Sequence, residues 1–243
     1  MMDTRNTVFE LGEAGPKMAI LSLGSTEQHS RHLPLCTDTL LSDVFCAEIG
    51  RQLGAYVLPT VPITNAMEHQ GRPGSVTVPP QVLADYVEAI VENLIEQGFR
   101  DVVIFIGHGG IFSIQPLLRV LNRRHAPRAR IVRVAYEQMH DAAQATGVIE
   151  TDELHSGEQE TSLMLYAAPE LVHMERAVDC QPTVGRDALN YQGIWHISPQ
   201  GAWGEPTKAT AEKGQIVFEA MAGAAVEYIR ETLAMMGENG YTR

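Results

Sequence analysis

The feature of this sequence that most constrains its fold is an alternation of short apolar segments with longer segments whose apolar residues recur at helical spacing. The short segments are expected to be strands and comprise residues 18–23, 56–62, 101–106 and 131–135. The longer segments are expected to be helices and comprise residues 37–53, 80–97, 114–124, 158–168 and 210–236. Strands that alternate with helices are typical of a sheet covered by helices. We therefore predict an α/β fold, a three-layer sandwich with a mostly parallel central sheet flanked by helices.

Two of these segments show the pattern most clearly. Residues 101–106 (DVVIFI) are apolar after the first position, as in a buried strand. Residues 80–97 carry apolar side chains along one helical face, and Gly98 is placed to end that helix. The helix at 37–53 begins with Thr37 and Asp38, either of which could cap it.

A single domain that spans residues 1–243 is predicted, because no repeat, low-complexity tract or Ser/Gly linker divides the chain. No run of about 18 apolar residues occurs, so we expect no transmembrane helix. The N-terminus lacks a basic stretch followed by an apolar core and does not resemble a secretory signal. We therefore expect a cytoplasmic protein.

Charge and cysteine content exclude further classes of protein. The formal net charge of −12 argues against binding to the phosphate backbone of nucleic acids. Neither a nucleic acid nor a membrane is an expected partner. Cys36, Cys46 and Cys180 form no CxxC pair and are odd in number, so we expect no disulfide framework.

Polar residues that suit chemistry follow two of the predicted strands. Glu27 and His29 come after the strand at 18–23, and His108 follows the strand at 101–106. Asp38 lies at the start of the next helix, near enough for a loop to bring it back. Ligands of α/β proteins bind at the carboxyl edge of the sheet, where these segments meet. Carboxylates and imidazoles together suit zinc, manganese or iron.

These residues also have an ordinary interpretation. A histidine at the end of a strand is often only hydrogen-bonded within a loop. Glu27 could stabilise a backbone turn, and Asp38 could be a helix cap. Residue type and spacing alone leave both interpretations open.

Four segments resemble the creatininase (creatinine amidohydrolase) family. Residues 24–39 (GSTEQHSRHLPLCTDT) resemble its signature GSTEQHGPHLPLGTDT, and residues 107–110 (GHGG) match a GHGG motif. Residues 155–165 (HSGEQETSLML) resemble HAGExETSLML, and residues 201–214 (GAWGEPTKATAEKG) resemble GxxGDPxxATAEKG. The matches occur in the family's order and extend over most of the chain.

The resemblance implies a centre with two divalent metal ions. Glu27 and His108 would hold one ion, His29 would hold the other, and Asp38 would bridge them. The second ion needs a further ligand, for which Glu160 is the candidate.

One position explains why Glu160 is needed. Creatininase proper has a glutamate two residues after the histidine of this motif, where this chain has Gly110. In its GHGG sequence this chain instead resembles the branch of the family that includes formylamino-pyrimidine deformylases and a peptide-processing peptidase.

The resemblance also implies a reaction. Two metal ions can hold a bridging hydroxide and polarise a carbonyl group. His155 would then pass a proton to the leaving nitrogen, although it could instead only support a ligand by hydrogen bonding. Glu158 is interpreted as structural.

The expected activity is hydrolysis of a non-peptide C–N bond, in a cyclic or formyl amide of a small molecule. The alternatives are a peptidase that trims a short peptide and a non-catalytic small-molecule or metal-binding protein.

Departures from the family pattern affect the expected substrate. The candidate substrate-binding residues are Arg72, Ser75 and Asp152, and Arg72 could hold an anionic group or could pair with Glu68. Thr151 occupies the position of a substrate-contacting tryptophan in creatininase proper, which makes creatinine an unconvincing substrate.

The resemblance also implies a homo-oligomer, because relatives of this type form homo-oligomers, with hexamers favoured. The apolar stripe of the last helix is one candidate interface.

Overall fold

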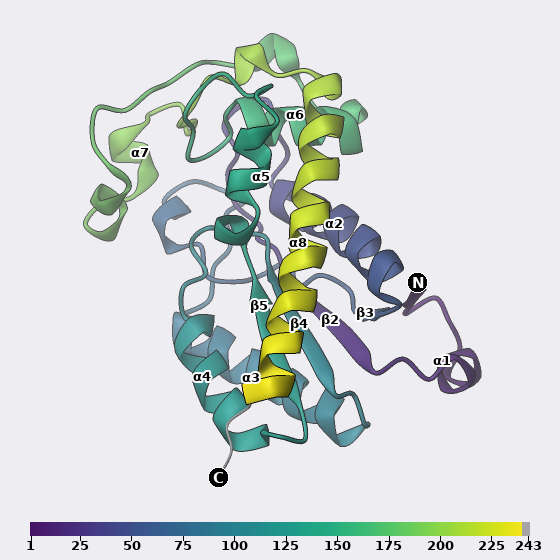
Figure 1. The fold of residues 1–243 in the computed structure, drawn as a ribbon. Helices are drawn as coiled ribbons and strands as arrows, with labels where there is room; N and C mark the ends of the chain where they lie inside the picture. The colour runs from purple at the N-terminus through teal and green to yellow at the C-terminus, as the bar shows by residue number, and fades with distance from the viewer. Residues whose placement is uncertain (240–243) are drawn as a thin grey trace.

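The computed structural model describes residues 1–239, which form a three-layer α/β sandwich around one sheet (Figure 1). Within these residues the sheet has five strands in the order β1-β3-β2-β4-β5, and all pairs are parallel. The strands are β1 (Met2–Asp3), β2 (Met18–Leu23), β3 (Tyr56–Val57), β4 (Asp101–Ile106) and β5 (Arg130–Val134). The predicted fold class is confirmed.

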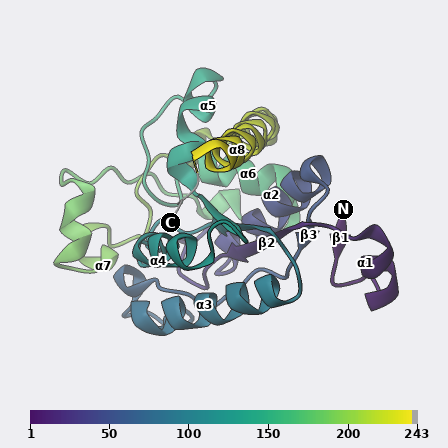
Figure 2. The same ribbon diagram turned by 60° about the horizontal axis from the view of Figure 1, so that its bottom comes forward.

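Helices cover both faces of the sheet (Figure 2). One layer contains α3 (Pro80–Glu96) and α4 (Ile114–His125). The other contains α2 (Thr37–Leu53), α5 (His140–Ala145), α6 (Glu158–Ala167) and α8 (Ala211–Asn239). Alternate residues of a strand point to opposite faces, so Leu21 packs with the first layer and Ile20 with the second. Both faces are buried, which explains why β2 and β4 are apolar almost throughout.

Several elements were not predicted. They are β1, α1 (Val8–Ala14), α7 (Ile194–Ile197), α5 and short 3₁₀ helices at Met67–His69, Tyr136–Gln138, Pro169–Leu171, Met174–Arg176, Arg186–Asn190 and Pro206–Lys208. The segment 56–62, predicted to be extended, contributes only β3 and an isolated bridge between Val61 and Leu23.

The predicted cap of α2 was wrong. Cys36 is the N-cap residue and makes no side-chain capping bond. The Thr37 hydroxyl donates to the Pro34 carbonyl instead, and Asp38 lies within the first helical turn. The Asp38 carboxylate is therefore available for another role.

The apolar stripe of α8 is used inside the chain. Val217, Met221, Val226 and Ile229 are buried against the second face of the sheet and its helices. This face of the helix therefore packs within one chain. Among residues 1–239 no helix is both long and apolar enough to cross a membrane.

The strand order fixes where a site can form. After β2 the chain adds β3 on one side, and β4 then pairs with β2 on the other side. Such a reversal opens a crevice at the carboxyl ends of the two central strands. Leu23 and Ile106, the last residues of β2 and β4, are directly paired. The segments that follow them therefore start side by side.

Candidate metal centre

The segments after β2 and β4 and the first turn of α2 bring four predicted ligands together. Glu27, His29, Asp38 and His108 are at least 95% buried. Gly107 permits this approach, because a β-carbon there would collide with the Ser42 hydroxyl of α2. A buried group of carboxylates and imidazoles requires charge compensation or a bound cation.

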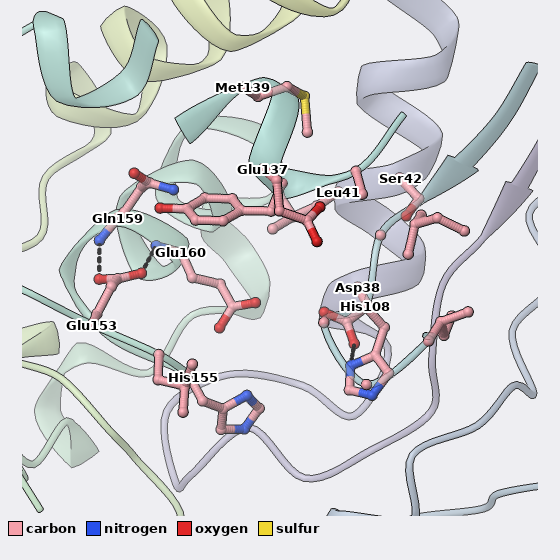
Figure 3. A pocket seen from close by; sticks show the side chains of 18 of the residues that line it. Asp38, Leu41, Ser42, His108, Glu137, Met139, Glu153, His155, Gln159 and Glu160 are labelled. Atoms are coloured by element: carbon pink, nitrogen blue, oxygen red, sulfur yellow. Dashed lines mark hydrogen bonds and ion pairs between the residues drawn. The ribbon is translucent and has the colours of Figure 1, made fainter. Parts of the chain in front are cut away.

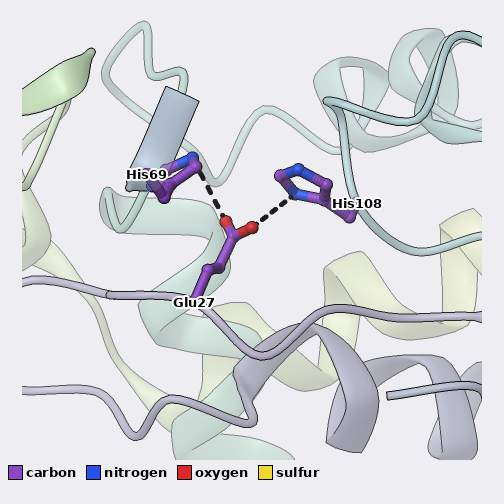
Figure 4. Close-up of side chains that lie close together, drawn as sticks. All are labelled: Glu27, His69 and His108. Atoms are coloured by element: carbon purple, nitrogen blue, oxygen red, sulfur yellow. Dashed lines mark ion pairs between the residues drawn. The ribbon is translucent and has the colours of Figure 1, made fainter. Parts of the chain in front are cut away.

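The first cluster surrounds His108. Its Nδ1 atom lies 3.1 Å from Glu27 Oε2 and 3.3 Å from Asp38 Oδ2. Figure 3 shows the contact with Asp38, and Figure 4 shows the contact with Glu27. The Ser25 hydroxyl donates to Glu27 Oε2 and fixes that carboxylate.

The second cluster surrounds His29. Its Nε2 atom lies 3.4 Å from Asp38 Oδ1 and 3.4 Å from Glu160 Oε1. The opposite ring nitrogen, Nδ1, lies 3.2 Å from the Glu27 carbonyl oxygen, which can only accept a hydrogen bond. In the neutral ring, which is the form that binds a metal ion, Nδ1 therefore carries the proton and Nε2 presents its lone pair to the cluster. The two oxygens of Asp38 face different clusters, which is the arrangement of a bridging carboxylate.

Glu160 reaches this cluster from the first turn of α6. Glu153 holds that turn, because its carboxylate accepts hydrogen bonds from the backbone N–H groups of Gln159 and Glu160 (Figure 3). The Ser156 N–H donates to Glu160 Oε2, which leaves Oε1 facing His29.

The structure also shows why no ligand comes from position 110. A β-carbon at Gly110 would collide with the Glu68 carboxylate and with His108. Glu68 Oε1 lies 3.4 Å from His108 Nε2 and occupies this space.

Unpartnered atoms at the centre fit metal ions. His29 Nε2 and Asp38 Oδ2 are buried and accept no hydrogen bond from any described residue. Leaving such atoms without a partner is costly, whereas a divalent cation would satisfy them. The described residues form three overlapping sets of donors that could each hold a metal ion: Glu27, His69 and His108; Glu27, His29 and His155; and His29, Asp38 and Glu160.

Neighbouring charges shift the pKa values of these groups. Burial disfavours a charged imidazole, but the Glu160 and Asp38 carboxylates outweigh it and raise the pKa of His29 well above its usual range. Burial likewise opposes ionisation of Asp38, but His29 and His108 hold the pKa of Asp38 below its usual range. The carboxylates of the centre therefore stabilise positive charge beside them, whether on an imidazolium or on a bound metal ion.

His155 lies beside these clusters with one ring nitrogen free. Its Nε2 atom lies 2.8 Å from the Gln28 main-chain carbonyl oxygen and 3.0 Å from the Gln28 side-chain amide nitrogen. That amide directs its two hydrogens to His69 Nδ1 and the Gly201 carbonyl, so His155 Nε2 donates to the Gln28 carbonyl and carries the proton. Its Nδ1 atom lies 3.8 Å from Glu27 Oε1. Burial, aided by the charge of His29, lowers the pKa of His155 to about 4, so the ring is neutral near pH 7. His155 therefore presents a basic nitrogen to the site.

His69 is a site residue that the sequence did not reveal. Its Nδ1 atom lies 3.0 Å from the Gln28 side-chain amide nitrogen, a donor, so the proton of the neutral ring lies on Nε2. His69 Nε2 lies 3.3 Å from Glu27 Oε1 (Figure 4). His69 also forms a possible metal-donor set with Glu27 and His108, and its contact orients the Glu27 carboxylate. The available signal was its position next to Glu68, in the segment that also contains the substrate-binding candidates Arg72 and Ser75.

Two serines next to the site have left-handed backbone conformations. Ser30 has a φ of 60° and Ser156 a φ of 52°, and each follows a site histidine. Non-glycine residues adopt this region at an energetic cost and mostly where surrounding contacts impose it. The strain is consistent with histidines held in fixed orientations.

A cavity of about 240 Å³ opens onto the centre. Its walls include Asp38, His108, His155 and Glu160, and Figure 3 shows their side chains directed toward a common space. A small molecule therefore has direct access to the two clusters.

The three candidate substrate-binding residues do not line this cavity. The Arg72 guanidinium lies 4.4 Å from the centre of the Trp195 ring, as in a cation–π contact. The Ser75 hydroxyl accepts a hydrogen bond from the Gln28 N–H, and the Asp152 carbonyl accepts one from Gln181. The structure gives Arg72 no ion pair with Glu68.

The chain is similar to known proteins in both sequence and structure. The family model described as "Creatinine amidohydrolase" matches residues 4–229. A mycofactocin precursor peptide peptidase from Mycolicibacterium smegmatis is 29% identical, with coverage of 88% of this chain and 84% of the relative. A creatinine amidohydrolase from Pseudomonas putida is 26% identical, with coverage of 90% of each. A solved structure of a creatininase variant of Zn-Zn type superimposes with a TM-score of 0.80 at 25% identity, covering 95% of this chain and 97% of that one.

Proposed function

The chain belongs to the creatinine amidohydrolase family, and we propose that it hydrolyses a non-peptide C–N bond in a cyclic or formyl amide of a small molecule. The observation that carries this proposal is the placement of Asp38, whose two oxygens face two separate histidine clusters. That arrangement supports a centre with two divalent ions, for which zinc, manganese and iron all suit the donor set. The GHGG sequence supports a place in the branch of deformylase-like relatives.

The reaction assigned to the site uses the residues as follows. Two divalent ions, when bound, would make a water molecule nucleophilic near neutral pH and polarise the substrate carbonyl. Glu27, His108, His29 and Glu160 would hold the ions, with Asp38 between them. His155 would take a proton at Nδ1 and return it to the nitrogen of the leaving group. Gln28 would keep the His155 ring oriented through the hydrogen bond at Nε2.

Peptide hydrolysis is the second candidate. The observation that favours it is the 29% identity to a peptidase over most of both chains. Both candidates use the same ions and the same histidine, so the distinction lies in the substrate. A non-catalytic role is disfavoured, because all five proposed ligands and His155 are present and converge.

Metal analysis together with a substrate screen tests the proposal. We expect close to two divalent ions per chain by elemental analysis, and loss of hydrolysis after chelation with recovery on adding metal back. The screen should include formamides, lactams and short peptides. Hydrolysis of peptides alone would favour the second candidate. Absence of metal, with no gain on reconstitution, would contradict both.

A homo-oligomer in the cytoplasm, with a hexamer favoured, is also part of the proposal. α1 supports the oligomer, because it buries none of its residues while Val8 and Phe9 are more than 75% exposed on it. Exposed apolar side chains grouped on one element are typical of an interface. We expect light scattering to give a mass several times that of the 26.7 kDa chain. Phe9→Glu should reduce the assembly and Glu13→Gln, on the same helix, should not. A monomeric wild-type protein would contradict the assembly.

A further inference from the structure

A cationic side chain outside the metal centre lines the same cavity. Arg133 lies near the carboxyl end of β5, where it is paired in register with Ile104 of β4. Its side chain is only 13% exposed, and it forms part of the cavity wall together with His108 and His155. An arginine buried to this degree requires an anionic partner or a full set of hydrogen bonds.

Arg133 has only part of the pairing that its charge requires. Its Nη2 atom lies 3.2 and 3.3 Å from the two carboxylate oxygens of Glu137, and Glu137 is 62% exposed. Such an exposed and long ion pair contributes little. The Nε atom of Arg133 is buried and has no hydrogen-bond partner among the described residues.

Arg130, on the same strand, is an arginine whose hydrogen bonds are made within the protein, and it serves as a comparison for Arg133. Its Nε and Nη2 atoms bind both oxygens of Asp101 at 2.7 and 2.9 Å, and its Nη1 donates to the Leu233 carbonyl. Arg130 is 34% exposed, so it is less buried than Arg133 and yet better satisfied. The incomplete pairing of Arg133 is therefore not a general property of arginines on this strand.

The acids that line the cavity leave Arg133 without a further protein partner. Asp38 and Glu160 face the metal clusters, and Glu68 lies against His108. Both oxygens of Glu153 accept backbone N–H groups of α6. Glu137 is the remaining cavity acid, and it occupies one nitrogen of Arg133.

A second arginine adds positive charge to the wall. Arg186 reaches the cavity from the segment before α7 and donates from Nη2 to the Gly109 carbonyl, next to His108. Arg133 and Arg186 come from distant parts of the sequence and meet at one cavity. Two guanidinium groups that line one cavity favour an anion there.

We propose that Arg133 binds a carboxylate of the substrate, so that the hydrolysed amide belongs to a small molecule with a carboxylate at its other end. The inference rests on the proposed amide hydrolysis and adds the substrate class. A substrate carboxylate would compete with Glu137 for Nη2, and its second oxygen would accept from another nitrogen of the same guanidinium. Arg186 supplies additional positive charge from the segment before α7.

Matched substrates test this inference. N-formylglycine is compared with N-formylglycinamide, and 5-oxoproline with 2-pyrrolidinone, since each pair differs by one carboxylate. We expect the wild-type protein to prefer the acid of a pair. Arg133→Met should lower that preference in kcat/KM about 10- to 100-fold, mainly through KM, the scale of a hydrogen bond to a charged group. Arg133→Lys should retain part of the preference, because it keeps the charge but not the fork.

Two further variants separate binding from structure. Arg119→Met changes an exposed arginine on α4 outside the cavity wall and should keep the wild-type preference. Glu137→Gln removes the competing carboxylate and should increase the preference. If Arg133 serves only an ion pair with Glu137, neither Arg133→Met nor Glu137→Gln will change the preference, and the inference is wrong.

Calorimetric binding gives a readout that does not depend on turnover. Glutarate should bind the metal-loaded wild-type protein at least about tenfold more tightly than glutaramide, and Arg133→Met should abolish this difference. A glutarate preference that Arg133→Met abolishes, without hydrolysis of any amide, supports the carboxylate site and contradicts the proposed activity. Amide hydrolysis without a preference for acids contradicts the carboxylate site alone.

Discussion

Replacing Asp38 with alanine is expected to release both metal ions and to lower kcat/KM by more than about 10³-fold. Its Oδ1 atom faces His29 and its Oδ2 atom faces His108, so a single change removes a ligand from both clusters. The loss should be large, because two-metal catalysis supplies several kcal/mol of transition-state stabilisation and each 1.36 kcal/mol corresponds to about a factor of ten. Elemental analysis of the purified variant and steady-state kinetics with added metal measure the two effects.

Asparagine variants provide the matched control. Asp38→Asn keeps the shape of the side chain but removes the charge, and it should bind at most one ion. Asp43→Asn makes the same change on an exposed position of the same helix, where the amide can still accept from Thr60, and it should retain both ions. An Asp38→Ala protein that keeps two ions per chain would show that Asp38 does not bridge them.

The central part of the fold was predictable from sequence because burial imposes a pattern on it. β2 and β4 are covered on both faces and are therefore apolar almost throughout, and α3 carries one apolar face against the sheet. α1 and α7 leave no such pattern. α1 buries none of its residues, and α7 has four residues with Ile194 alone buried. Elements that bury few residues need no periodic pattern of apolar residues, so the sequence does not reveal them.

The convergence of the predicted ligands follows from strand order, whereas their supporting contacts do not. Glu27, His29 and His108 follow strands that proved to be adjacent, so they had to lie close together. Gln28 instead contacts His69 through its side-chain amide and His155 through its main-chain carbonyl, across 41 and 127 residues. No local pattern signals contacts between segments so far apart.

The direction of a side chain was the hardest property to predict. Arg72 was the candidate for an anionic group, but its guanidinium packs on Trp195 outside the cavity wall. Arg133 lines the cavity, although its sequence position, between two buried valines of an apolar strand, resembles that of an ordinary edge-strand arginine. Motif resemblance locates a segment near a pocket, but only packing decides which of its residues face inward.

Replacing His155 with alanine is expected to keep both metal ions and to lower kcat about 10²- to 10⁴-fold, the usual contribution of a general acid–base group. The Gln28 carbonyl holds the proton on Nε2, so Nδ1 is the atom that can accept and return a proton. Because burial lowers the pKa of His155 to about 4, this nitrogen is unprotonated over the physiological range. Elemental analysis and steady-state kinetics on the same preparation measure metal content and turnover together.

His155→Asn and His173→Ala complete this test. Asparagine can keep a hydrogen bond to Gln28 but is not basic, so it should retain both ions and lose turnover to a similar extent as alanine. His173 is exposed and lies outside the cavity wall, and its replacement should change neither property. The alternative role of His155 is that of a metal ligand, because it forms a possible donor set with Glu27 and His29. If His155→Ala loses one ion per chain, His155 is a ligand, and another group must carry the proton to the leaving nitrogen.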